Sequence, residues 1–550
     1  MPKITIDGKD CEFEPGQLIL QVALDNDIEI PYYCYHPGLS VVANCRICLA
    51  EVWAPNPRND NKLEPIPKLL PTCQTTAGDG QVVYTDSPKS IANQKAVMEY
   101  LLINHPVDCA VCDQAGECHL QDYAYQFGRG TSRFQEQKIK QPKKDIGPHV
   151  LLYADRCIMC TRCVRFCREI TGTNELVVEG RGATEQIDIF PGMALDNELS
   201  ANVIDICPVG ALLDKDFLFQ QRVWFLTQTP SIDGITCSGD NIFVEHNEGQ
   251  VYRIKPRTNL DINQWWITDE VRYGWKFVHD ENRIVIPSVK GEDAYEPTEA
   301  PLAYEAAYAR TNELLGNAKH IALMISPMLS CEDAFLLAKY IIAHETEVTF
   351  GIGPVPHAGE DKTFEGGYKL YSEKTPNARG VMRVLEAFAA NVLDYQEFVG
   401  RLRKGNGIDA LLLTGNYPSD WVIDSFIQAL ESQGAKSVIL IDTLPNALTE
   451  IADVIIPGAT WMEKTGTFEN VNNRLQTFSR AIKPIDYCKS EAQIALDLEA
   501  DRSGDDVVVY DAASVRQTMA DTHDLREFVS EVHLPPQSQK IESDMEVVKL

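Results

Sequence analysis

The sequence predicts a multidomain protein whose N-terminal part is α+β and whose C-terminal part is α/β. Two observations support this prediction. Fourteen of the 16 cysteines lie before residue 238, whereas strands alternate with helices and cysteines become rare from about residue 280 onward. In addition, a chain of 550 residues is too long to fold around one hydrophobic core.

Residues 1–84 are expected to form a β-grasp domain of the ferredoxin type. KITIDGKDCEFEPG alternates apolar and polar residues on either side of Asp7 and Gly8, which is typical of a hairpin. QLILQVALDNDIEIP follows with helical spacing, and a hairpin followed by a helix is how a β-grasp begins. The unit closes near GQVVYTDSP. Cys11, on the second predicted strand, is expected to be a packed thiol.

The next segment, SPKSIANQKAVMEYLLINHP, has the apolar spacing of a helix and should end at His105, because Pro106 disfavours helical backbone in the residue before it. The spacing and the cysteine positions together predict five further parts: 85–124 with histidine and three cysteines, 140–220 with a cysteine-rich fold, 221–280, an α/β domain at 281–530, and a tail at 531–550.

Three strand–helix units predict the parallel sheet of the α/β domain. HIALMIS precedes CEDAFLLAKYIIAH, GIDALLLTGN precedes DWVIDSFIQALES, and AKSVILIDT precedes ALTEIA. No G-x-G-x-x-G motif follows any of these strands, so a dinucleotide site on this sheet is not expected.

The composition is that of an ordinary globular protein, with 44% hydrophobic and 24% charged residues. A net charge of -30 argues against nucleic acid or an anionic membrane as a partner. No apolar run reaches the roughly 18 residues that a membrane span requires. MPKITIDGKDCEFEPGQ starts on a strand pattern, so we expect the protein to work in the compartment where it is made.

The first cysteine set consists of Cys34, Cys45, Cys48 and Cys73, with the spacing C-x10-C-x2-C-x24-C. Four thiolates from one loop and one later strand suit a [2Fe–2S] cluster, as in plant-type ferredoxins, whose first gap is shorter. A structural zinc site is the alternative, and the β-grasp start favours iron. A disulfide framework fits less well, because such frameworks serve small exported domains.

The second set consists of His105, Cys109, Cys112 and Cys118, in NHPVDCAVCDQAGEC. Its three thiolates, spaced C-x2-C-x5-C, are one fewer than a cubane cluster needs. His105 is either a residue that caps the helix C-terminus or the fourth ligand, and the spacing alone leaves both open. A neutral imidazole in place of a thiolate removes one negative charge and should raise the potential of a cluster.

The third set consists of Cys157, Cys160 and Cys163 in DRCIMCTRCVRFCREI and of Cys207 in VIDICPVGAL. The pattern C-x2-C-x2-C-x3-C with a distant Cys-Pro is typical of bacterial [4Fe–4S] ferredoxins. A second complete cluster would need three more cysteines near Cys207, so one cubane is expected. Cys167 is then left over as a packed thiol.

In this order the three sets resemble the large iron–sulfur subunit of respiratory complex I, which is the G-type subunit of bacterial NADH:quinone oxidoreductases and the 75 kDa-type subunit in mitochondria. The resemblance implies a [2Fe–2S] cluster on the first set and [4Fe–4S] clusters on the second and third, with His105 as a ligand. It continues through PSIDGITCSGDNIFVEHNEGQVYRIKPR and reaches ADVIIPGATWMEKTGTFENVNNRLQ, which is similar to molybdopterin oxidoreductases.

One departure from the family concerns an additional cubane that some members carry just before the α/β region, in a C-x2-C-x3-C run with a later cysteine. The matching positions here are Asp233, Thr236, Asp240 and Thr268, and Cys237 is the one thiol nearby. We therefore expect this cluster to be absent from the 221–280 domain.

The α/β region is shorter than in molybdenum enzymes, so its fold is expected to be kept as a scaffold without molybdopterin. Cys331, in SPMLSCEDAF, is the candidate for a metal-bound thiolate. It begins a predicted helix after a strand, a position that suits ordinary packing, and packing is the interpretation we favour.

The resemblance implies an electron-transfer subunit of the peripheral arm, within an NADH dehydrogenase but without a catalytic site of its own. Electrons from NADH, oxidised on a neighbouring FMN-bearing subunit, would pass through the clusters toward quinone. The implied partners are that subunit, a [2Fe–2S] subunit, quinone-module subunits and ferredoxin-like [4Fe–4S] subunits. They would provide the contact with the membrane, on the cytoplasmic side in bacteria or the matrix side in mitochondria.

The competing hypothesis is an electron-relay or catalytic subunit of an NAD-linked formate dehydrogenase or hydrogenase. Such a formate dehydrogenase should have the additional cluster cysteines and a metal-ligating Cys or selenocysteine. An iron hydrogenase needs several cysteines in its C-terminal half, where this chain has Cys331 and Cys488 alone. These features favour the complex I family.

Overall fold

The structure is a computed structural model that describes residues 1–540 except 292–296, 405–406 and 434–436. Residues 541–550 of the predicted tail lie outside the described residues. The chain divides into two compact units. The first comprises Met1–Phe225 with the short segment Phe364–Tyr368, and the second comprises Leu226–Thr363 and Lys369–Lys540. All three cysteine sets lie in the first unit.

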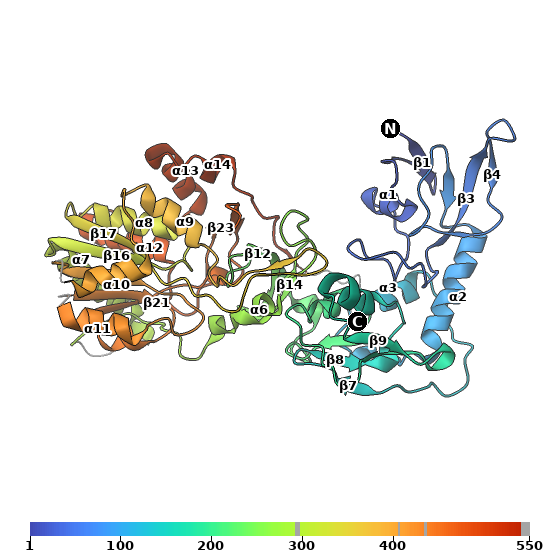
Figure 1. The fold of residues 1–550 in the computed structure, drawn as a ribbon, viewed down its shortest axis with the longest axis horizontal. Helices are drawn as coiled ribbons and strands as arrows, with labels where there is room; N and C mark the ends of the chain where they lie inside the picture. Colours follow the sequence, from blue (N-terminus) through green and yellow to red (C-terminus); the bar gives the residue numbers. More distant parts are fainter. Residues whose placement is uncertain (292–296, 405–406, 434–436, 541–550) are drawn as a thin grey trace. The chain divides into compact units, whose positions relative to one another are not determined.

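The first unit begins with the predicted β-grasp (Figure 1). Its hairpin turns at Asp7 and Gly8, which both have positive φ, the geometry that the favoured two-residue hairpin turns require. The strands form one sheet in the order β2-β1-β6-β3-β4, with β5 beside β3 and with β1 parallel to β6. The elements are β1 (Lys3–Ile6), β2 (Lys9–Glu12), α1 (Ile19–Asp25), β3 (Leu49–Asn56), β4 (Lys62–Pro65), β5 (Leu70–Pro71) and β6 (Val82–Tyr84).

Helix α2 (Pro88–Asn104) follows this sheet and ends at His105, as predicted. A proline in its first turn suits the helix start, because the missing N–H would have no helical partner there. Of the apolar stripe in its sequence, Met98 is fully buried while Ile91 is 38% exposed, so part of the stripe faces solvent. Two short elements come next, η1 (Cys109–Val111) and α3 (His119–Gln126).

The rest of the first unit is a small α+β fold around the third cysteine set. Strands β11, β8 and β7 form one antiparallel sheet, and β9 and β10 form a hairpin. The helix that starts at Arg162 continues as one π-helical turn. The elements are β7 (Lys143–Asp145), β8 (Val150–Tyr153), η2 (Ala154–Arg156), α4 (Arg162–Phe166), η3 (Cys167–Thr171), β9 (Leu176–Glu179), η4 (Gly182–Thr184), β10 (Gln186–Ile189), α5 (Asn202–Ile206), β11 (Leu212–Asp214) and η5 (Val223–Phe225).

The second unit opens with an antiparallel sheet of β12 (Thr227–Ile232), β13 (Asn241–Asn247) and β14 (Gln250–Pro256). Strand β25 (Gln539–Lys540) pairs with the free edge of β12, so the end of the described chain returns to this sheet. Helices α6 (Asp269–Tyr273) and η6 (Gly274–His279) follow.

The predicted α/β domain is a six-stranded sheet in the order β15-β22-β21-β20-β16-β17, parallel except for its edge strand β15. Every residue of β16, β20 and β21 is buried, as expected of strands covered by helices on both faces. The strands are β15 (Ser288–Val289), β16 (His320–Ile325), β17 (Glu347–Ile352), β20 (Ala410–Thr414), β21 (Ser437–Asp442) and β22 (Val454–Pro457).

Helices cover both faces of this sheet (Figure 1). One core is shared by the sheet and by α7 (Ala300–Gly316), α8 (Cys331–Ile342) and α12 (Glu491–Ser503). A second core lies under α10 (Tyr395–Arg403) and α11 (Asp424–Gln433). The first two predicted strand–helix units are therefore confirmed, whereas ALTEIA forms only a 3-10 turn, because β22 begins a few residues later.

The remaining elements of the second unit complete its edges. They are η7 (Pro297–Glu299), β18 (Lys362–Thr363), β19 (Lys369–Leu370), α9 (Ala378–Glu386), η8 (Ala447–Glu450), η9 (Trp461–Glu463), β23 (Gly466–Glu469), β24 (Leu475–Phe478), α13 (Ala512–His523) and α14 (Glu527–Ser530). Among the residues that the structure describes, no helix combines the length and the apolarity needed to cross a membrane.

Candidate iron–sulfur sites

The structure brings the first cysteine set together around one loop of the β-grasp domain. Cys34, Cys48 and Cys73 are buried and Cys45 is partly exposed. The Sγ atoms of Cys48 and Cys73 lie 3.5 Å apart. The loop between Cys34 and Cys48 folds back on itself through positive φ angles at Ala43 and Arg46.

The thiols of the first set are electrostatically coupled. Hydrogen bonds from the Cys45 and Cys73 thiols lower the pKa of Cys34, and a hydrogen bond from Cys73 lowers the pKa of Cys48 to about 7. All four sulfur atoms therefore form one connected group. Depressed thiol pKa values favour the thiolate, which is the form that binds metal.

The second set lies where α2 ends. Cys112 and Cys118 are buried and Cys109 is partly buried in the 3-10 turn that begins with it. Burial raises the pKa of Cys112 and raises that of Cys118 to about 12. The Nδ1 atom of His105 is buried and has no hydrogen-bond partner among the described residues. Burial also lowers the pKa of His105, which favours the neutral imidazole that metals bind.

His119 has the same two properties and was missed by the sequence analysis. Its Nδ1 atom is buried without a hydrogen-bond partner among the described residues, and burial lowers its pKa to about 4. It directly follows Cys118, so a histidine next to a cysteine was the available signal. Two histidines of this region therefore compete for the fourth position, and the unpartnered atoms alone do not separate them.

The loop of the second set is held by arginines. Arg222 donates from Nη1 to the carbonyl oxygen of Cys112 over 2.8 Å. Arg156, which is 3% exposed, pairs with Asp108 over 2.7 Å and reaches the carbonyl oxygen of Gly210. A side chain at Gly210 would collide with the sulfur atom of Cys112, so this close approach requires glycine.

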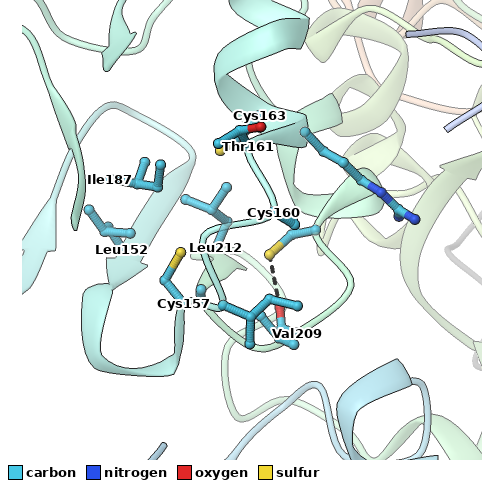
Figure 2. A pocket seen from close by; sticks show the side chains of 12 residues that line it. Leu152, Cys157, Cys160, Thr161, Cys163, Ile187, Val209 and Leu212 are labelled. Atoms are coloured by element: carbon cyan, nitrogen blue, oxygen red, sulfur yellow. Dashed lines mark hydrogen bonds between the residues drawn. The ribbon is translucent and has the colours of Figure 1, made fainter. Parts of the chain in front are cut away.

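The third set surrounds one cavity (Figure 2). Figure 2 shows Cys157, Cys160 and Cys163 around it, and Cys207 also lines it. The rest of the lining is mostly apolar. It consists of Leu152, Ile158, Thr161, Arg162, Ile187, Val209, Ala211 and Leu212.

The backbone and the electrostatics of the third set fit a cluster. Met159 and Thr161 have positive φ, so the backbone between Cys157 and Cys163 turns sharply around the cavity. Burial raises the pKa of Cys157, of Cys163 and of Cys207, and raises that of Cys160 to about 11. Four buried thiolates would be costly by themselves, and bound iron supplies the compensating positive charge.

Cys167 does not line this cavity. It is fully buried in the π-helical turn Cys167–Thr171, and burial is the largest of the causes that raise the pKa of its thiol. Its position is that of the packed thiol that the sequence analysis expected.

The positions of the additional cluster lie in the second unit and bond to one another. The Asp233 carboxylate accepts hydrogen bonds from the backbone of Ile235 over 2.8 Å, from the backbone and hydroxyl of Thr236, and from the Ser238 hydroxyl over 3.0 Å. The backbone N–H of Asp233 donates to the carbonyl oxygen of Asp240 over 2.8 Å. The loop is thus closed by its own oxygen atoms.

Thr268 and Cys237 have ordinary structural roles there. The Thr268 hydroxyl caps α6 by accepting from the backbone of Val271 over 3.2 Å. Cys237 is 1% exposed, and burial raises its pKa to about 12.

Cys331 is packed at the start of α8. It is fully buried, and the Asn377 amide donates to its sulfur atom over 3.4 Å. The neighbouring acids belong to an internal ion network: Lys464 pairs with Asp333 over 2.8 Å and also with Glu491. Within the described ranges of the chain, no group of three or more His, Cys, Asp or Glu side chains is placed to hold a single metal ion.

Five protein-family models match the chain. They are "2Fe-2S iron-sulfur cluster binding domain" at residues 2–88, "NADH-ubiquinone oxidoreductase-G iron-sulfur binding region" at 94–133, "NADH-quinone oxidoreductase subunit 3, ferredoxin-like domain" at 147–213, "NADH-ubiquinone oxidoreductase NDSU1/NuoG-like, 4Fe-4S domain" at 226–276 and "Molybdopterin oxidoreductase" at 389–500. The predicted fold class is confirmed by these matches. The fourth of them covers the loop of Asp233.

Two curated proteins illustrate the similarity. The G-type subunit of NADH-quinone oxidoreductase from Rickettsia bellii is 40% identical over 275 residues, which are 50% of this chain and 39% of that protein. The mitochondrial 78 kDa subunit of NADH-ubiquinone oxidoreductase from Neurospora crassa is 41% identical over 320 residues, which are 56% of this chain and 41% of that protein. The matched part thus spans about two fifths of the length of these relatives.

Among solved structures, an NAD+-reducing [NiFe]-hydrogenase in the H2-reduced state matches 40% of this chain and 91% of its own, with 29% identity and a TM-score of 0.35. The curated relatives and the four iron–sulfur family models agree with the order of the cysteine sets. The chain is related to the large iron–sulfur subunits of NADH-quinone oxidoreductases, the G-type subunit in bacteria and the 78 kDa subunit in mitochondria.

Proposed function

We propose that the chain is an iron–sulfur electron-transfer subunit of NADH:quinone oxidoreductase, passing electrons from the NADH and FMN module toward quinone. The observation that supports this most directly is the cavity of the third set, where four cysteines from two distant segments meet in an apolar lining. Such a lining excludes water and keeps a buried redox centre at a short distance from its neighbours.

Each set would hold one cluster, and the clusters would supply the one-electron chemistry. The first set, Cys34, Cys45, Cys48 and Cys73, would hold [2Fe–2S]. The third set would hold [4Fe–4S] through its four cysteines. The second set would hold [4Fe–4S] through Cys109, Cys112, Cys118 and a histidine, for which the family resemblance favours His105 over His119.

The contribution of the protein is to bind, orient and shield. Positive φ angles at Met159 and Thr161 wrap the loop around the third site, and Arg222 and Arg156 hold the loop of the second. Acid–base or nucleophilic groups are not needed for electron transfer, and we assign no catalytic residue to this chain.

We also propose that the additional cubane is not formed. The side chain of Asp233 already satisfies four donors of its own loop, and Thr268 caps a helix. Carboxylates and hydroxyls are poor ligands for iron–sulfur clusters, which are held mainly by thiolates. Molybdopterin is likewise not expected in the second unit.

The partners follow from the same proposal. The chain would contact the subunit that carries FMN and NADH, a [2Fe–2S] subunit, and the quinone-module and ferredoxin-like [4Fe–4S] subunits. Membrane contact would be made by partner subunits, and nucleic acid would not bind an acidic chain of net charge -30.

Iron and acid-labile sulfide analysis of the purified full-length chain tests this function, together with low-temperature EPR after reduction. Three clusters of the proposed types predict about ten irons per chain and one [2Fe–2S] signal. Zinc without sulfide would overturn the electron-transfer role. About fourteen irons would instead overturn the absence of the additional cluster.

A further inference from the structure

Two buried arginines of α4 connect the first and third sets. Arg162 is 5% exposed and Arg165 is 2% exposed, and both lie within the cysteine run of the third set. Charged side chains are rarely buried to this extent unless their contacts hold them there.

Arg165 bonds to both sets at once. Its Nη2 atom donates to the carbonyl oxygen of Cys34 and, over 3.4 Å, to that of Cys160. Its Nη1 atom donates to the carbonyl oxygen of Ser40, in the loop of the first set. One guanidinium thus touches the backbone of a cysteine from each set.

Arg162 repeats the arrangement one helical turn away. Its Nη2 atom donates to the carbonyl oxygen of Tyr35 over 2.6 Å, next to Cys34. Its Nη1 atom donates to the carbonyl oxygen of Ile206 over 3.1 Å, next to Cys207. Arg162 also lines the cavity of the third set.

Other contacts hold the same two segments without either arginine. The Glu169 carboxylate accepts from the backbone and hydroxyl of Ser40 over 2.8 and 2.6 Å. The Asn44 amide donates to the carbonyl oxygen of Met159 over 3.3 Å. Removing one arginine therefore leaves direct contacts between the two loops, which makes a mutational test practical.

The guanidinium groups bond to neutral carbonyl oxygens rather than to carboxylates, so their positive charge is not cancelled by these partners. Charge–charge interactions are strong at buried positions, where solvent screening is weak. Both charges act to lower the pKa of the Cys160 thiol, opposing the larger effect of burial. The Nε atoms of both arginines are buried without a partner among the described residues.

We propose that Arg162 and Arg165 are positioning residues that join the first and third sets into one electron-transfer pair. They hold the two cysteine loops at a fixed separation, and their charges stabilise the reduced state at both sites. This rests on the proposed function, because it requires clusters on both sets.

The test is a potentiometric EPR titration of the full chain carrying Arg165→Gln. Loss of a positive charge shared by two sites should lower the midpoint potentials of both clusters. We expect about a tenfold change in the oxidised-to-reduced ratio at each site, which is about 59 mV for a one-electron couple. Arg165→Lys should recover part of the shift, since it keeps the charge.

Arg168→Gln is the matched control. Arg168 lies in the same segment, but its side chain is 59% exposed and pairs with Glu169 over 3.0 Å. Its charge is screened by water, so both potentials should stay at the wild-type values.

Three results would overturn the proposal: no shift with Arg165→Gln, a shift at one cluster alone, or an equal shift with Arg168→Gln. If Arg165→Gln fails to assemble clusters, Arg162→Gln provides the same test, with the same two-site shift expected and its absence contradicting the proposal. A wild-type chain without iron and sulfide would instead refute the proposed function, so the two failures are distinguishable.

Discussion

The third cysteine set and the Asp233 loop are both compact turns, yet they solve the problem of buried polar groups in opposite ways. Around the third set, four thiols line an apolar cavity and burial raises their pKa values. In the Asp233 loop, one carboxylate accepts hydrogen bonds from its own neighbours. Thiols arranged in this way need an external partner to become thiolates, whereas the oxygen atoms are already satisfied.

The largest effect that tests this comparison is expected from Cys160→Ala. Loss of one of the four thiolates that line the cavity should remove the cluster of the third set, which is about four irons per chain. Iron analysis and EPR measure this loss. Cys167→Ala is the control, because that thiol is buried outside the cavity. The same iron loss in both variants would show that the cavity does not define the ligands.

The second prediction concerns the one site where a histidine stands among thiols. His105→Cys should keep the second cluster and lower its midpoint potential by on the order of 100 mV, because a thiolate adds one negative charge. His119→Ala serves as the control, since its unpartnered Nδ1 makes it the rival ligand. If His119→Ala changed the EPR signal of this cluster while His105→Ala did not, the ligand assignment would pass to His119.

The third prediction sharpens the description of the Asp233 loop. Burial raises the pKa of Asp233 to about 6 in the folded chain, above the ordinary aspartate value of 3.8. The folded state therefore holds this proton more tightly than the unfolded state does. Its contribution to the free energy of unfolding is complete below about pH 4 and is lost as the pH rises through about 6.

Asp233→Asn should remove this pH dependence, since an amide does not titrate. Urea unfolding of the second unit between pH 4 and pH 8 would measure the change. Asp261→Asn is a suitable control, because the Asp261 side chain is 73% exposed. Equal pH profiles for wild type and Asp233→Asn would show that the carboxylate does not bind its proton as proposed.

The smallest effect is expected from Cys331→Ala, which tests a lone buried thiol. We expect the iron content to stay unchanged and the free energy of unfolding to fall by about 1 kcal/mol, the central tendency for point mutants. Iron analysis and urea unfolding measure the two quantities. A loss of iron would mean that the second unit holds a metal site.

Much of the fold could be predicted because its signals are local. The hairpin at Asp7 and Gly8, the end of α2 before Pro106 and the buried strands β16, β20 and β21 all follow from short-range patterns. ALTEIA, by contrast, has a helical pattern but lies too close to the next strand for a full helix, so chain length between strands decided its form.

The candidate site divides in the same way. The sequence by itself determined the cysteine sets, because thiols that share a cluster are placed by short, recognisable spacings. Only the tertiary structure decided that Gly210 lies against Cys112, that His119 has a buried free nitrogen, and that Arg165 bonds across two sets. Arg165 and Cys34 are 131 residues apart in the chain, and packing rather than spacing brings such distant segments together.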